Sequence, residues 1–173
     1  MKIDAAYTRP FKGPHVISAS QPLELPAVHF DLGGERYAFH DFDTANRTNN
    51  NYRSRNGDPQ GDAADIEGDG VNIGYTNAGE WLLYTVEVLD EGEYLFDISE
   101  SAGADGGKFH LEINDVKATE TIHVPNNHSW GAWRWHPETP ATINLTKGIH
   151  KIKFRFENGG FNLRALRFIK NNN

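Results

Sequence analysis

Three tryptophans lie close together near position 130, and their type and spacing suit contact with a flat apolar surface. Trp130, Trp133 and Trp135 follow a turn-like segment, residues 125–129. Because alternate residues of a strand face opposite sides, Trp133 and Trp135 should share one side, whereas Trp130 stands at the end of the loop. Large exposed rings usually have something that covers them. The cluster therefore indicates either core packing or a surface that stacks on the C–H face of a sugar.

Other residues that could carry chemistry lack the spacing that catalysis or metal binding requires. No nucleophile-elbow or phosphate-binding glycine motif occurs, and His123, His128 and His136 do not have zinc-ligand spacing. The acidic stretch at residues 65–70 resembles the first half of a helical calcium loop, but Thr76 stands where its final Glu is required. These patterns favour surface or packing roles for the histidines and a solvated acidic turn.

The composition narrows the class of the protein and its partners. A chain of 173 residues suits a single domain, and its net charge is −7 with a pI of about 5.6. An acidic surface repels phosphate backbones and anionic lipids, so we expect neither nucleic acid nor a membrane as partner. Without cysteine, disulfides and thiolate metal sites are excluded. The first seven residues lack the apolar stretch of a signal peptide, so the chain is either cytosolic or a mature segment with an added Met.

Period-two alternation of apolar residues is the main structural signal. It occurs at residues 81–88, 94–98, 109–113 and 151–156, with turn-forming residues between such segments. No window of a dozen residues has a helical stripe. Several short strands at this spacing predict an all-β fold, which we assign as an antiparallel β-sandwich.

The regions outside the regular strands fall into three parts. Residues 1–24 hold three prolines with little periodicity, and they are expected to form an N-terminal leader or inter-module linker. Residues 171–173 are expected to be a disordered C-terminal end, which leaves residues 25–170 as the domain. Residues 41–74 form a long polar stretch with Tyr52 in its middle, and loops of this length are usually functional or disordered.

Short motifs along the chain resemble those of family 6 carbohydrate-binding modules. The most specific is Gly-Glu-Trp-Leu-Leu-Tyr-Thr-Val at residues 79–86. The others are Phe-Asp-Leu-Gly-Gly-Glu at 30–35, Ala-Phe-His-Asp at 38–41, Asn-Tyr-Arg at 51–53, Asp-Ile-Glu at 65–67, the tryptophan segment at 124–133 and Gly-Gly-Phe-Asn-Leu at 159–163. Together these motifs cover about residues 25–170.

The resemblance implies a jelly-roll sandwich attached to a secreted polysaccharide-degrading enzyme, with a glycan site in the loops at one end. In such a site two rings hold one sugar unit while an Asn binds its hydroxyls. Carried onto this sequence, the expected carbohydrate-binding residues are Tyr52, Trp130, Asn162, Glu35 and Arg53. The expected ligand is a polysaccharide such as xylan, a β-glucan or agarose. The module itself is expected to be non-catalytic and monomeric, and to target a linked glycoside hydrolase.

The sequence departs from the family pattern in two places. Family members hold a structural calcium with acids on an early strand, but Val28 and Pro26 stand at the corresponding positions here. An apolar side chain offers no hard-oxygen ligand, so the usual calcium ligand positions are altered, and a structural calcium stays an open alternative. The stretch between Asp43 and Asp65 is longer than usual and could reshape the cleft.

Two alternatives to the end-loop site stay open. The glycan could bind on the concave face of a sheet, on exposed rings such as Trp135 or Tyr94. A hydrolase would need a paired acid and base, for which only Glu35 is an obvious candidate. The remaining large rings of the motifs are assigned to packing; they are Trp81, Tyr84 and Trp133.

Overall fold

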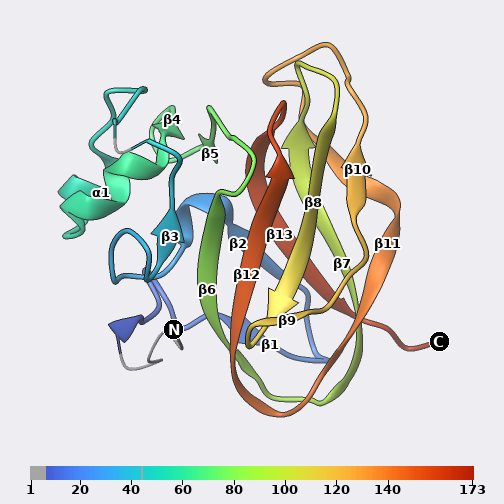
Figure 1. The fold of residues 1–173 in the computed structure, drawn as a ribbon. Helices are drawn as coiled ribbons and strands as arrows, with labels where there is room; N and C mark the ends of the chain where they lie inside the picture. The colour runs from blue at the N-terminus through green and yellow to red at the C-terminus, as the bar shows by residue number, and fades with distance from the viewer. Residues whose placement is uncertain (1–6, 44) are drawn as a thin grey trace.

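A computed structural model describes residues 7–43 and 45–173, which fold mainly into β-strands (Figure 1). The strands are β1 (Val16–Ile17), β2 (Leu23–Pro26), β3 (Phe39–His40), β4 (Ile66–Glu67), β5 (Asn72–Ile73), β6 (Trp81–Val88), β7 (Gly92–Ser101), β8 (Gly107–Ile113), β9 (Val116–Lys117), β10 (Ile122–Val124), β11 (Arg134–Leu145), β12 (Gly148–Asn158) and β13 (Asn162–Lys170). Helical structure is confined to α1 (Tyr52–Arg55) and to 3-10 turns that include Ala27–His29 and Pro59–Ala64. Within the described ranges, no helix has the length and apolar character needed to span a bilayer.

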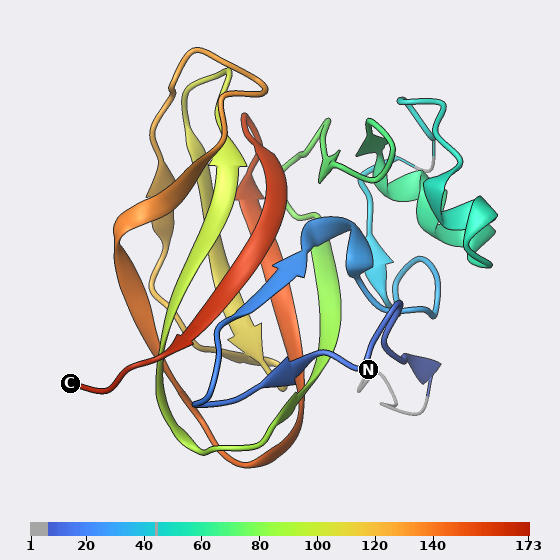
Figure 2. The same cartoon turned by 180° about the vertical axis from the view of Figure 1, so that it is seen from behind.

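The strands form two sheets that face each other, which confirms the predicted β-sandwich. One sheet has the order β1-β6-β12-β8-β10, with β3 added to β6 and β9 to β8. The other has the order β11-β7-β13-β5-β4, with β2 added to β13, and Figure 2 shows it from its own side. The named strand pairs are antiparallel except for β1 and β6. Neighbours that are distant in sequence, such as β6 and β12, produce the crossovers of a jelly roll.

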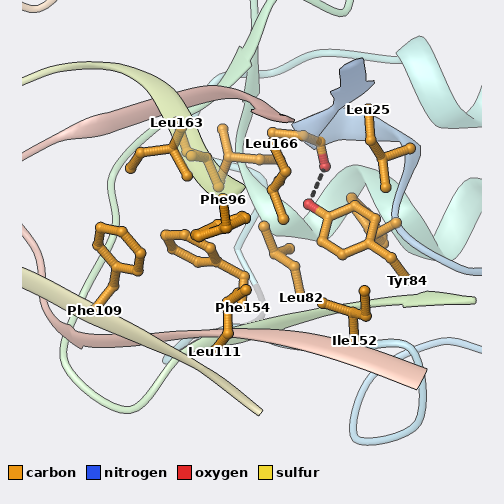
Figure 3. Packing of buried hydrophobic residues seen from close by; sticks show 14 of the residues in the cluster. Leu25, Leu82, Tyr84, Phe96, Phe109, Leu111, Ile152, Phe154, Leu163 and Leu166 are labelled. Carbon is orange, nitrogen blue, oxygen red and sulfur yellow. Dashed lines mark hydrogen bonds between the residues drawn. The ribbon is translucent and has the colours of Figure 1, made fainter. Parts of the chain in front are cut away.

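The core is a layer of aliphatic and aromatic side chains between the two sheets (Figure 3). Because alternate residues face inward, Phe154 of β12 meets Phe109 of β8 in a stacked pair with ring centroids 4.6 Å apart. From the opposite sheet, Phe96 of β7 packs edge-on against Phe109. The buried hydroxyl of Tyr84 donates a hydrogen bond of 2.7 Å to the carbonyl of Ala27, which satisfies the polar group inside the core.

The segment that was expected to be a leader packs against the sandwich from residue 8 onward. Phe11 and Ile17 are buried, and β1 pairs with the end of β6. Backbone hydrogen bonds also join Arg9 to Leu32 in both directions. Residues 8–24 therefore belong to the folded unit, while residues 1–6 lie outside the described part of the chain. At the other end, the backbone N–H of Asn171 donates to the backbone carbonyl of Glu93 (2.9 Å).

Strand pairing brings four separate loops to the upper end of the sandwich in Figure 1. Asn162, the first residue of β13, lies opposite Ser101, the last residue of β7. Leu163 lies opposite Ile73, so the segment that follows β5 reaches the same end. The loops at residues 74–80, 102–106, 125–133 and 159–161 meet there.

Candidate functional site

An open cleft of about 420 Å³ lies among these loops. Its lining residues are Glu67, Tyr75, Thr76, Trp130, Gly160 and Asn162. The rings of Tyr75 and Trp130 come from distant parts of the chain and are 56 % and 54 % exposed. Asn162 is only 4 % exposed and forms the polar floor. The cleft therefore combines two accessible rings with a buried amide.

The loop that carries Trp130 is fastened to the end of β7 by side-chain hydrogen bonds. The amide of Asn127 accepts from the backbone N–H of Ala102 and donates to the carbonyl of Ala132, both at 2.9 Å. The hydroxyl of Ser101 accepts from the N–H of Ala132 at 3.0 Å. These bonds restrain the loop on both sides of the ring. The indole is therefore held in position before any ligand arrives.

Two glycines allow the walls of the cleft to approach each other closely. A Cβ atom at Gly103 would overlap the indole of Trp130, so this ring lies directly on bare backbone. A Cβ at Gly159 would overlap the carbonyl of Thr76. The hydroxyl of Thr76 donates to the carbonyl of Phe161 at 3.0 Å, which joins the Tyr75 segment to the β12–β13 hairpin.

Tyr75 has an unusual backbone conformation. Its φ of 52° lies in the left-handed region, which residues other than glycine rarely adopt. The amide of Asn77 donates to the carbonyl of Tyr75 at 3.0 Å, and the same amide donates to Glu80 at 3.1 Å. The backbone N–H of Asn77 also donates to Glu80, at 2.9 Å. This network holds the turn in the unusual conformation.

The floor of the cleft presents hydrogen-bond acceptors. The side-chain nitrogen of Asn162 donates to Glu67 Oε2 (3.0 Å) and to the carbonyl of Trp130 (2.9 Å). Glu67 Oε2 also accepts from Asn72 at 2.6 Å. Within the described residues, Asn162 Oδ1 and Glu67 Oε1 have no hydrogen-bond partner from the protein. These two oxygens can therefore accept hydrogen bonds from hydroxyl groups of a ligand.

Of the predicted site residues, Trp130 and Asn162 line the cleft, but Tyr52 does not. Tyr52 lies on α1, where its hydroxyl makes a 2.9 Å hydrogen bond with His29. Its ring stacks on the His29 ring at 9° and contacts Phe11 edge-on. Tyr52 was predicted as the first ring of the site, but the ring that lines this cleft together with Trp130 is Tyr75.

Arg53 is also removed from any ligand, since its side chain is completely buried. All five of its N–H donors are used within the protein. Two donate to Asp58 Oδ2 at 2.9 and 2.5 Å. The other three donate to the carbonyls of Val28, Phe30 and Asp31 at 2.7–3.0 Å. Arg53 therefore fixes the turns around it and cannot reach a sugar.

Glu35 lies outside the cleft and closes its own loop. One carboxylate oxygen bonds His40 Nδ1, and the other accepts from the N–H of Asp41 at 3.0 Å. Glu67 is the single carboxylate among the residues that line the cleft. Because glycoside hydrolysis ordinarily uses two carboxylates, this arrangement lacks the acid–base pair of a hydrolase.

The two rings suggested for a sheet-face site are covered. Tyr94 is fully buried. Trp135 is partly buried, and the guanidinium of Arg167 lies 3.8 Å from its ring centroid. A sugar would have to displace that cation to stack on Trp135. Neither ring therefore offers a free platform.

The positions at which family members have calcium ligands do not supply them here. Val28 is buried, its carbonyl accepts from Arg53, and Pro26 has no side-chain oxygen. Among the residues that the structure describes, no group of three or more His, Asp or Glu side chains is placed to hold a metal ion.

An acidic cluster lies behind the Tyr75 wall. Burial, followed by the charges of Glu80 and Asp65, raises the pKa of Asp41 to about 8. Burial also raises the pKa of Asp65 to about 6 and raises the pKa of Glu80. At neutral pH the cluster therefore carries less negative charge than its composition indicates.

Four residues of the cleft were not predicted from the sequence, and among them Tyr75 supplies a ring and Glu67 a carboxylate; the other two are Thr76 and Gly160. Tyr75 stands in a turn-rich stretch, Gly74 to Gly79, directly before the strand at 81–88. This context is as polar as that of Tyr52, so it could have identified Tyr75. Glu67 is the third residue of the Asp-Ile-Glu motif. Because adjacent residues of a strand point to opposite faces, Glu67 points away from the face on which Ile66 is buried.

A β-sandwich that carries two exposed rings above an acceptor-lined floor is an arrangement suited to a carbohydrate-binding module. The family model for "Carbohydrate binding module (family 6)" matches residues 33–170. The chain therefore belongs to family 6 of the carbohydrate-binding modules, whose members bind sugars without catalysing their cleavage.

Solved structures with the same fold include several modules from polysaccharide-degrading enzymes. Module CBM6cm-2 of lichenase 5A from Cellvibrio mixtus, in complex with cellotriose, is 30% identical over 58% of this chain and 77% of that chain, with a TM-score of 0.52. The C-terminal family 6 module of the laminarinase LamC from Zobellia galactanivorans is 20% identical over 87% of this chain and 100% of that chain, with a TM-score of 0.61. No curated protein matches the chain.

Proposed function

We propose that this module binds a neutral polysaccharide by holding one sugar unit between Tyr75 and Trp130. Asn162 Oδ1 and Glu67 Oε1 accept hydrogen bonds from its hydroxyls. The observation that carries this proposal is the cleft itself, in which two half-exposed rings stand above a floor whose free groups are acceptors. Rings stack on the C–H faces of sugars, and acceptors fix the hydroxyl groups around them.

The charge of the cleft supports a neutral ligand. Its one lining carboxylate, Glu67, would repel a uronic acid or a sulfated sugar, and the whole chain has a net charge of −7. A β-glucan is the first candidate, because the 30%-identical lichenase module was solved with cellotriose. Xylan and agarose are the other candidates.

The biological role that follows is targeting. A shallow cleft buries little of its ligand, so we expect a dissociation constant of about 10 µM to 1 mM for one site. Such an affinity suits a secreted module that keeps a linked glycoside hydrolase close to its substrate. The single carboxylate in the cleft supports a binding role rather than a hydrolytic one.

Affinity electrophoresis and titration calorimetry on a panel of glycans test this function. The panel contains a mixed-linkage β-glucan, laminarin, xylan, agarose and, as an anionic control, polygalacturonate. We expect retention on a neutral glycan and none on polygalacturonate. Trp130→Ala should abolish retention, whereas Trp130→Phe should keep most of it because a ring remains. Normal binding by Trp130→Ala would disprove the end-loop site.

A second measurement addresses catalysis. Incubation of the isolated chain with each glycan should release no reducing sugar. Sugar release that disappears in Glu67→Gln would contradict the non-catalytic function.

A further inference from the structure

Phe42 is the most exposed of the large hydrophobic side chains in the described residues, with 71 % of its surface accessible. Single exposed apolar residues are common on protein surfaces, so exposure alone gives it no role. Its position is more informative, because Phe42 lies in the segment that is fastened to the Tyr75 wall of the cleft.

One buried carboxylate joins Phe42 to the cleft. Glu80 is 5 % exposed, and its Oε1 accepts from the backbone N–H of Phe42 at 3.1 Å. The same oxygen accepts from the side chain of Asn77, also at 3.1 Å. That Asn77 amide in turn donates to the carbonyl of Tyr75. A carboxylate and an amide therefore bridge the backbone of Phe42 to the backbone of Tyr75.

The backbone that carries Phe42 is held on both sides. Before it, β3 pairs with β6 through Phe39 and Leu82. Next to it, the carboxylate of Asp41 accepts from the N–H of Asp43 at 3.0 Å. A ring on a restrained backbone loses less conformational freedom when a ligand covers it, so more of the contact energy becomes affinity.

We propose that Phe42 forms a further sugar subsite beside the Tyr75–Trp130 cleft. A neighbouring unit of the same polysaccharide chain stacks on this ring while the first unit occupies the cleft. The inference rests on the proposed function and extends it, since it makes the ligand a chain of several units rather than a mono- or disaccharide. We assign a unit of the same polysaccharide as the occupant because Glu80 and Asn77 join the backbone of Phe42 to that of Tyr75, which forms a wall of the cleft.

Titration calorimetry with short and long oligosaccharides tests the subsite. The probes are the di- and hexasaccharide of the series that the glycan panel selects, beginning with cellobiose and cellohexaose. Phe42→Ala should weaken binding of the hexasaccharide by about fivefold to tenfold, as for removal of one stacked ring, and should leave the disaccharide unchanged. Phe42→Trp should restore the affinity for the hexasaccharide.

The control variant is Ile149→Ala. Ile149 is 62 % exposed and pairs with Glu87, at the end of β6 away from the cleft, so its removal should change neither affinity. Equal hexasaccharide affinity for Phe42→Ala and the wild type would overturn the subsite. An equal loss for both lengths would also overturn it, because the loop would then support the cleft rather than bind sugar. In both cases, weakened disaccharide binding by Tyr75→Ala would leave the proposed function standing.

Discussion

Tyr52 and Tyr75 stand in equally polar stretches of sequence, yet the protein uses them in opposite ways. The ring of Tyr52 is covered by His29 and Phe11, while that of Tyr75 is 56 % exposed beside the cleft. The difference comes from what lies next to each loop in the fold. The N-terminal segment supplies Phe11 against α1, whereas no segment among the described residues covers the ring of Tyr75 in the turn after β5.

This contrast separates two regions with different tasks. Around α1, buried polar groups and rings hold together segments that lack regular strands. Around residues 74–80, strained backbone and buried acids hold a ring in solvent. We expect substitutions in the first region to change stability and substitutions in the second to change affinity.

The largest effect should come from Arg53→Met in the α1 region. The substitution leaves Asp58 and three backbone carbonyls without their buried partner. Breaking a buried ion pair by removing one partner costs about 3–5 kcal/mol of unfolding free energy. Urea denaturation measures this loss, and glycan affinity at low temperature should not change in the fraction that folds.

Arg55→Ala is the matched control on the same helix. Its side chain is 50 % exposed and pairs with the exposed Asp69, so its removal should alter stability by less than about 1 kcal/mol. A similar loss of stability in both variants would remove the distinction between buried and exposed arginines.

The two tyrosines provide the most direct test. Tyr75→Ala should weaken glycan binding about tenfold, the loss of one stacked ring, and leave the melting temperature nearly unchanged. Tyr52→Ala should keep its glycan affinity but lose about 2 kcal/mol of stability, because a half-buried ring leaves a cavity. Calorimetric titration measures the glycan affinity of each variant, and thermal melting measures its stability. Loss of affinity in Tyr52→Ala alone would reverse the comparison.

A smaller effect is expected where the cleft depends on bare backbone. Gly103→Ala should displace the indole of Trp130 and weaken glycan binding about fivefold, while the fold remains intact. Gly131→Ala lies in the Trp130 loop, but a Cβ atom there has open space, so it should bind normally. Trp fluorescence should change in the first variant only. If both variants bind the glycan like the wild type, binding does not depend on the close contact between the Trp130 indole and the backbone of Gly103.

The smallest effect concerns pH. The pKa of Asp41 is raised to about 8 by burial and by Glu80 and Asp65, so between pH 4 and 8 the native state holds a proton that the unfolded chain releases. Stability should therefore fall as the pH rises from 6.5 to 8, and Asp41→Asn should flatten this slope. Below pH 6.5 the lowered pKa of His29, about 4, acts in the opposite direction. Melting temperatures at pH 6.5, 7.25 and 8 measure the slope, and an unchanged slope in Asp41→Asn would exclude Asp41 as its source.

Local patterns were sufficient to predict the sandwich and its family, because both depend on signals within a few residues. Alternation at residues 151–156 corresponds to the inward face of β12, and the Gly-Glu-Trp motif begins β6. The family match at residues 33–170 agrees with the motifs. The N-terminal segment was harder to interpret, since its apolar residues are buried by parts of the chain that are distant in sequence: Phe11 packs against α1, and Ile17 lies on β1, which pairs with β6.

The cleft could be predicted in part for the same reason. Trp130 and Asn162 belong to recognisable motifs, and the fold brings both to one end of the sandwich. Which tyrosine joins them depends on the pairing of β5 with β13, a contact across about ninety residues that no local pattern shows. Arg53 illustrates the same limit, because an arginine beside a loop tyrosine gives no sign that all five of its N–H donors are bonded to four acceptor oxygens within the protein.

One amide hydrogen of Asn162 is bonded to Glu67 and the other to the carbonyl of Trp130. The side chains of Asn162 and Glu67 can therefore accept hydrogen bonds from a ligand but have no free hydrogen to donate. Such a floor discriminates between a free hydroxyl and an etherified one. If the sugar oxygens that contact the floor are methylated or closed into an anhydro bridge, they have no hydrogen to donate. Their lone pairs would then face the lone pairs of the Asn162 and Glu67 oxygens and be repelled. Chemical masking of the glycan could therefore prevent recognition without any change in the shape or charge of the protein.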